Sequence, residues 1–154
     1  MSDPTTQRST ASADTISHQS ISLAAGRRVL DAALARATQL GRALNIMICD
    51  PWGEPVISAR MDGASRMSAQ IAADKAWTVA GFRGMPTHKW WPMIEDDPAL
   101  VHGITKTPRL VIFGGGIALT VDGVVVGAIG VSGGSSDEDR EVAEAGAAAL
   151  AGPS

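Results

Sequence analysis

The stretch GGIALTVDGVVVGAIGVSGG, residues 115–134, constrains the fold more strongly than any other part of the chain. It has Asp122 and Gly123 between two apolar runs rich in β-branched residues, which is the strongest short-range signal for a β-hairpin. The strands on either side are therefore expected to be antiparallel. This arrangement excludes a dinucleotide-binding loop, because the glycines are spaced G-x-x-G-x-x-G-G and the fingerprint G-x-G-x-x-G belongs to a parallel βαβ unit.

The segment that follows this hairpin, SSDEDREVAEAGAAAL, predicts a helix. Ser135 or Ser136 can cap its first turn, and the acidic residues 137–139 suit the positive end of the helix dipole. Carboxylates in this place would repel a phosphate group. We therefore interpret the turn as a capped helix start, and we expect Gly127 and Gly130 to mark close packing against a helix or a neighbouring strand.

The rest of the chain predicts two further helices and a second hairpin. Residues 20–41 predict an amphipathic helix with a serine as N-cap and Gly41 at its C-terminal end. Residues 43–63 predict a hairpin that turns at the sequence DPWGE, and residues 65–82 predict the next helix.

Composition and charge exclude several classes of protein. The net charge of −3 gives no long-range attraction to nucleic acid or to an anionic membrane, and no apolar run reaches membrane-spanning length. The single cysteine, Cys49, excludes an intrachain disulfide. Residues 1–16 are polar and predict a disordered tail without a secretory signal, before one domain over residues 17–151. We expect a cytoplasmic protein.

One charged residue, Lys75, falls on the apolar stripe of the helix predicted over residues 65–82. The apolar members of this stripe are Ile71, Val79 and Phe82. Either the lysine stem packs while its ammonium reaches water, or the lysine stands at a pocket wall and pairs with a ligand carboxylate or carbonyl. Arg60 and Asp62 close one face of the preceding strand, as a solvated pair or as the mouth of a pocket.

Residues 83–109 have weak periodicity and predict an irregular segment with one or two short helices. The segment carries His88, His102 and the adjacent Trp90 and Trp91. A long loop in a compact domain tends to be functional or to pack against a partner. We expect the tryptophan pair to be buried under a neighbouring subunit.

The glycine run at residues 114–116 allows two interpretations. It can form a bulge or bend before the hairpin. It can also expose backbone N–H groups and let a ligand or another subunit approach closely. We favour the bend.

Three motifs occur in a characteristic order: SARMDGAS, then ADKAWTVA, then GGIALTVDGVVVGAIGVSGG with an acidic helix start after it. Residues 21–150 thereby resemble the GlcG/HbpS-like family, also called the haem-degrading domain family. The resemblance implies an α/β (α+β) single domain of profilin-like architecture, with an antiparallel sheet flanked by helices. It also implies homo-oligomers, often octamers, some of which bind haem or related ligands. Arg60, Asp62, Lys75, Gly115 and Gly116 match positions that shape the cleft of the family.

These features support a small-ligand-binding protein, with haem or a related planar anionic molecule as the ligand. Haem iron takes an axial His, Cys, Met or Tyr ligand, and the candidates are His88 first, then His102 and Cys49. The chain lacks the Cys-x-x-Cys-His motif, so haem would be bound noncovalently. By the resemblance, Gly115, Gly116 and Asp62 would contribute to the cofactor site. The histidine spacings predict no metal-ion site.

Two other functions are consistent with the sequence. The first is a cofactor-independent enzyme, such as an isomerase, cyclase or lyase, that acts on a small carbonyl or carboxylate compound. In it, Lys75 would be a base or electrophile, Arg60 would hold a carboxylate, and His88 would transfer a proton. The second is an oligomeric accessory protein without chemistry of its own.

Overall fold

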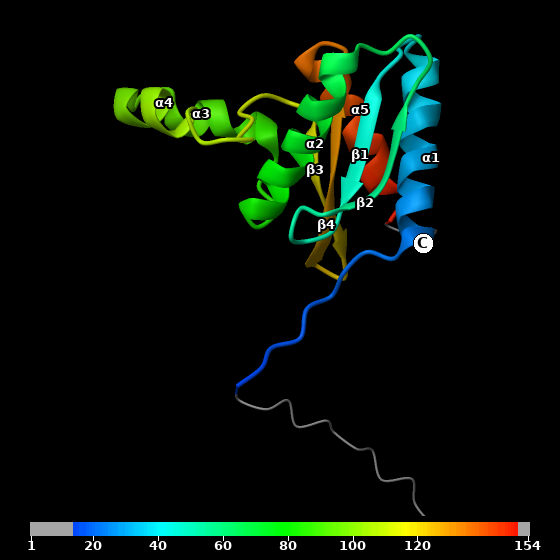
Figure 1. Ribbon diagram of the computed structural model, residues 1–154, viewed down its shortest axis with the longest axis horizontal. Coiled ribbons are helices and arrows are strands. Elements are labelled where there is room, and N and C mark those ends of the chain that lie inside the picture. Colours follow the sequence, from blue (N-terminus) through cyan, green and yellow to red (C-terminus); the bar gives the residue numbers. More distant parts are fainter. Residues whose placement is uncertain (1–13, 151–154) are drawn as a thin grey trace, which may run out of the picture.

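The computed structural model describes residues 14–150, so most of the predicted N-terminal tail and residue 151 lie outside the described residues (Figure 1). Within this range the chain forms a four-stranded antiparallel sheet with strand order β2-β1-β4-β3. The strands are β1 (Asn45–Cys49), β2 (Pro55–Arg60), β3 (Gly116–Val121) and β4 (Val124–Ser132). The helices are α1 (Leu23–Gln39), α2 (Arg66–Gly81), η1 (Thr87–Lys89), α3 (Trp90–Ile94), α4 (Pro98–Ile104) and α5 (Ser136–Ala148). The predicted α+β class, a single domain with an antiparallel sheet flanked by helices, is confirmed.

Helices cover both faces of the sheet. Helices α1 and α5 pack on one face, where the larger apolar cluster lies, and α2 packs on the other (Figure 1). Small side chains line the interface beneath α2, so the helix backbone comes very close to β4. A Cβ atom at Gly130 would collide with the Ala72 carbonyl oxygen. The prediction that Gly130 marks close packing is therefore confirmed.

Both predicted hairpins form. In the second one, Asp122 and Gly123 have φ angles of 49° and 77°, and Val121 pairs directly with Val124. A two-residue turn with positive φ at both central positions is the type that fits the twist of antiparallel strands. The Asp-Gly pair, which accepts positive φ angles, is therefore sufficient to explain the turn.

The helix starts follow the predicted capping. Ser22 caps α1 by accepting a hydrogen bond from the Ala25 amide at 3.1 Å. In α5, the Ser135 hydroxyl accepts from the Glu138 amide at 3.2 Å, and the Glu138 carboxylate accepts from the Ser135 amide at 2.9 Å. This reciprocal capping box makes Ser135 the cap and leaves Ser136 as the first helical residue. Among the described helices, none is long and apolar enough to cross a membrane.

Strand β3 begins only at Gly116, after the apolar residues 110–113. Residues 109–115 form a loop that packs on α2, because the Thr78 hydroxyl takes the place of a strand partner. This hydroxyl accepts from the Val111 amide and lies 3.0 Å from the Arg109 carbonyl oxygen. These two backbone groups of the loop thus find a partner without a sheet.

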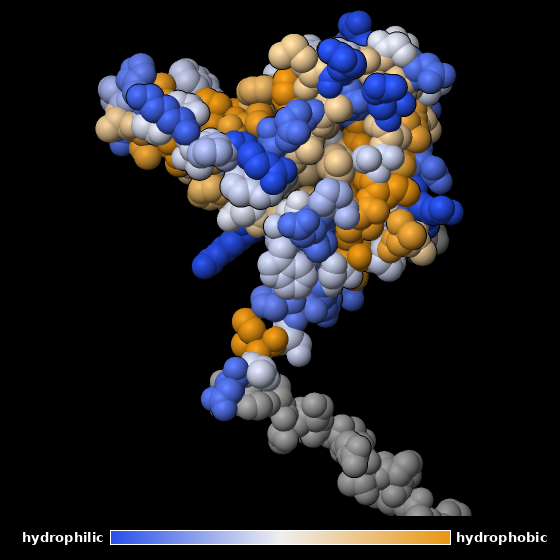
Figure 2. All heavy atoms as spheres, viewed as in Figure 1, coloured by the Kyte–Doolittle hydropathy of each residue, from blue (hydrophilic) through white to orange (hydrophobic). Residues whose placement is uncertain are grey.

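Residues 83–109 form three short helices, η1, α3 and α4, where the sequence predicts one or two. Helices α3 and α4, here called the arm, project from the body of the domain (Figure 1). The prediction for the tryptophan pair is wrong for Trp90, because its own chain buries it to 1% exposure and Phe82 packs on it edge to face. Trp91 is 48% exposed, and hydrophobic residues lie at the surface of the arm (Figure 2).

Candidate functional site

Lys75, the charged residue on the apolar stripe of α2, is completely buried. Its ammonium donates to the Val131 carbonyl at 2.8 Å and to the Asp139 carboxylate at 2.9 Å, and it lies 4.9 Å from the centre of the Phe113 ring. The ammonium therefore does not reach water, and its partners in the structure are groups of the chain itself rather than a ligand. Burial lowers the pKa of Lys75, and the charge and hydrogen bond of Asp139 partly oppose this effect.

Asp139 is the partner that the sequence analysis missed. Its second carboxylate oxygen accepts from the Gly134 amide at 2.9 Å, so the side chain ties α2, β4 and the start of α5 together. The sequence pattern predicts it only as one of the acids that suit the positive end of the helix dipole. The helical period did contain a signal, because Asp139 precedes the buried Val142 and Ala143 by three and four residues and shares their face.

The glycine run packs directly on this ion pair. Gly115 has a φ of 124°, and a Cβ atom there would lie 2.7 Å from the Lys75 ammonium nitrogen. The Gly115 carbonyl accepts from the Val131 amide at 2.8 Å, and the Gly116 amide donates to the Thr87 hydroxyl at 2.9 Å. The favoured interpretation, a bend, fits this geometry. The Gly116 amide is engaged within the chain rather than offered to a ligand.

His88 follows Thr87 and lies on the same side of the domain as the glycine run. The residue is half-buried, and its Nδ1 atom is buried without a hydrogen-bond partner. Burial lowers the pKa of His88, the nearby Arg140 lowers it further, and Glu144 opposes them. The imidazole is therefore held neutral at neutral pH, with a nitrogen lone pair or N–H group unsatisfied. Lys75, Gly115, Gly116 and His88 thus gather in one region.

The remaining predicted residues lie elsewhere. Arg60 is exposed at the end of β2 and lines a pocket to which Lys75 does not contribute, and Asp62 is exposed in the turn that follows. His102 is exposed on the arm. Lys75 and Arg60, which the enzyme hypothesis needs at one substrate, are not brought into one pocket.

Cys49 does not fit the role of an axial ligand. Its side chain is 1% exposed beneath α2, and burial raises the pKa of its thiol to about 12. The thiol is therefore protonated and inaccessible in the folded chain. Within residues 14–150, no group of three or more His, Cys, Asp or Glu side chains is placed to hold a metal ion.

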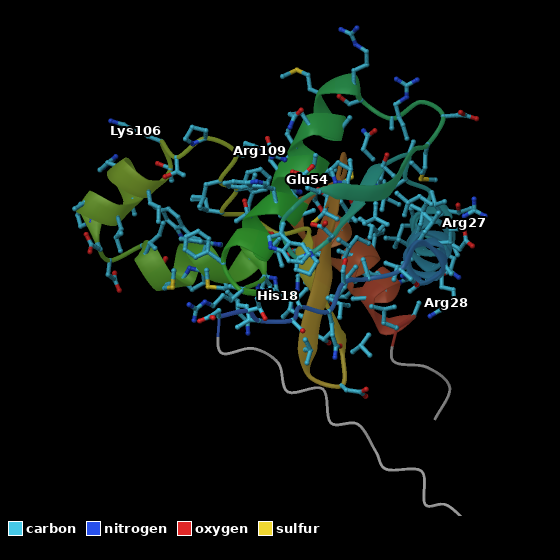
Figure 3. All side chains as sticks on the ribbon, turned by 60° about the horizontal axis from the view of Figure 1, so that its bottom comes forward. His18, Arg27, Arg28, Glu54, Lys106 and Arg109 are labelled. Atoms are coloured by element: carbon cyan, nitrogen blue, oxygen red, sulfur yellow. The ribbon has the colours of Figure 1, made fainter. Side chains whose placement is uncertain are left out.

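An aromatic and charged surface near the β1–β2 turn was also missed. The rings of His18 and Trp52 meet edge to face at 5.4 Å, and the guanidinium of Arg109 lies 5.0 Å from the Trp77 ring centre (Figure 3 labels His18 and Arg109). Arg109 also donates to Asp74 at 2.8 Å. These pairs join segments far apart in the chain, so the sequence holds no local signal for them.

Comparison with known proteins identifies a family and several similar structures. A family model described as "Haem degrading protein HbpS-like" matches residues 21–148. The chain is 35% identical over 121 residues to the corrinoid adenosyltransferase PduO of Salmonella typhimurium, a match that covers 77% of this chain but only 35% of that protein. The Klebsiella pneumoniae protein ORFY has a TM-score of 0.84 and 29% identity, over 91% of this chain and 97% of that one. A solved PduOC:heme complex has a TM-score of 0.77 and 32% identity, over 84% of this chain and 94% of that one.

Proposed function

Since the chain belongs to the HbpS-like family, we propose that it binds haem, or a related planar anionic molecule, noncovalently through His88. The observation that carries this proposal is the buried, unpartnered Nδ1 atom of a half-buried histidine. A buried polar atom without a partner in a native fold calls for an explanation, and a bound group can supply it. The solved PduOC:heme complex, at 32% identity, supports haem as that group.

The chemistry around His88 fits a haem ligand. An axial imidazole must be neutral to donate a lone pair to iron, and the lowered pKa of His88 keeps it neutral. Arg140, whose charge acts on His88, offers a cation for a propionate group. Phe113, which is 47% exposed and lies by the Lys75 ammonium, offers apolar surface for a planar ring. Bound haem would supply an iron centre for redox or oxygen chemistry.

Hemin titration tests this proposal. Hemin added to the protein is expected to shift the Soret band, and His88→Ala should weaken binding by about tenfold or more, because a lost iron bond exceeds the ~1.4 kcal/mol that a tenfold change represents. His102→Ala and His18→Ala serve as matched histidine controls and should bind as the wild type does. An unchanged spectrum, or hemin binding that is as tight in His88→Ala as in the wild type, would reject His88 as the haem ligand.

We also propose that the protein is a homo-oligomer, and an octamer by its family resemblance. The exposed apolar side chains of the arm, Trp91, Met93 and Leu100, support a contact between copies. Helix α4 contains no buried residue and packs mainly on α3, so a neighbour would stabilise it. Sedimentation should show a species several times the chain mass of 15.9 kDa, and a monomer at micromolar concentration would overturn this proposal.

A further inference from the structure

The pocket that Arg60 lines lies where α2 stops short of the sheet edge. Helix α2 packs on β1, β3 and β4, and edge strand β2 extends beyond its cover. Alanine side chains on the helix leave space beside that strand. The pocket is lined by Asn45, Ile46, Met47, Ser58, Ala59, Arg60, Ala69 and Ala72. Its volume of about 100 Å³ is far below that of a site for a drug-sized ligand or a haem, and it suits only a small molecule.

Asn45 gives this pocket an unsatisfied polar group. Its side chain is buried to 3% exposure, and its Nδ2 atom donates to the Ser65 carbonyl at 2.8 Å. That hydrogen bond fixes the orientation of the amide, because a flipped amide would bring two oxygens together. The Oδ1 atom is left buried without a partner. A hydroxyl or amine hydrogen from a ligand would satisfy it.

The charges around the pocket favour an anion. The guanidinium of Arg60 lies at its wall and forms no ion pair with any residue in the range 14–150. The N-terminus of α2 lies about one turn before Ala69 of the pocket wall, and it has no side-chain cap and no acidic residue in its first turn. Unsatisfied amides and the helix dipole make such an end attractive to a carboxylate. The start of α5, by contrast, is fully capped by its own acids.

We infer that this pocket binds a small carboxylate that carries a hydroxyl or amine on the adjacent carbon. The carboxylate pairs with Arg60, and the hydroxyl or amine donates to Asn45 Oδ1. The short carbon chain lies against Met47, Ala69 and Ala72. This site is separate from the one proposed for haem, and neither proposal depends on the other.

The test uses L-lactate as the probe and propionate as its matched partner, which lacks only the hydroxyl. Two-dimensional amide NMR follows the Asn45 side-chain resonances in the full chain. Lactate should shift these resonances with millimolar affinity, and propionate should bind about tenfold more weakly, as expected when a buried acceptor stays unpaired. Shifts that are absent, or equal for the two acids, would overturn the inference.

Variants of two lining residues test whether lactate binds in this pocket. Arg60→Gln removes the charge, and Ala69→Leu fills the pocket from an exposed helix position, so both should abolish the lactate shifts while the remaining spectrum stays folded. Arg28→Gln, at an exposed arginine of α1, is the control and should bind as the wild type does. Lactate binding that survives both Arg60→Gln and Ala69→Leu would place the ligand elsewhere and refute the proposed site.

Discussion

Replacing Lys75 by Met tests how the buried ion pair holds the domain together. The change keeps the length and apolar character of the side chain but removes the ammonium that Asp139 and the Val131 carbonyl contact. Asp139, which is 2% exposed, would keep only its hydrogen bond from the Gly134 amide. Its carboxylate would then be a buried charge without a counterion.

The expected effect is large. Removing one partner of a buried ion pair costs about 3–5 kcal/mol, because the remaining charge stays desolvated. A domain of this size has a total stability of about 5–15 kcal/mol. Lys75→Met should therefore lower the melting temperature by roughly 10–20 °C. Asp139→Asn in the same chain removes the stranded charge and keeps an acceptor for the Gly134 amide, so the double variant should recover most of the loss.

Urea unfolding followed by tryptophan fluorescence measures these effects at one fixed protein concentration. Lys106→Met is the control, since Lys106 is exposed and forms no ion pair within the described residues, and its effect should stay within about 0.5 kcal/mol. A Lys75→Met variant as stable as the wild type would refute the reasoning. A double variant no more stable than Lys75→Met would show that the unpaired Asp139 carboxylate does not cause the loss of stability.

Three further predictions follow from the described contacts. Ser135→Ala should destabilise the protein by about 0.5–2 kcal/mol in urea unfolding, whereas Ser136→Ala, which loses no capping bond, should be nearly neutral. Cys49 should resist alkylation in the native protein and react fully in denaturant, as mass spectrometry would record; rapid native labelling would contradict its burial and its raised pKa. The pKa of His88 is lowered in the folded chain, so the unfolded chain binds more protons as the pH drops below the ordinary value of 6.5, and the stability of the fold decreases as the pH decreases there. His88→Gln should remove this part of the pH dependence of stability. A pH profile identical to that of the wild type would disprove the prediction.

The elements that the sequence predicts correctly depend on local chemistry. The Asp122-Gly123 turn and the Ser135 cap each act within a few residues, so their sequence patterns are sufficient. The contact between Lys75 and Asp139 spans 64 residues and depends on where α5 packs, which no local pattern reports. The periodicity of the two helices does place both side chains on buried faces.

The structure does not bring Arg60 and Lys75 into one cleft, for a similar reason. Arg60 and Lys75 were expected at one cleft, but strand order decides their separation. Arg60 lies on the edge strand β2, whereas Lys75 reaches Val131 on the inner strand β4. Strand order is a property of the whole fold, so an expectation based on neighbouring motifs could not establish it.

A crystal structure of the protein with hemin tests the central claim most directly. The account predicts an iron atom bonded to an imidazole nitrogen of His88, with a propionate group near Arg140. Iron bonded to His18 or His102 instead, or hemin absent from crystals grown with an excess of it, would contradict the account.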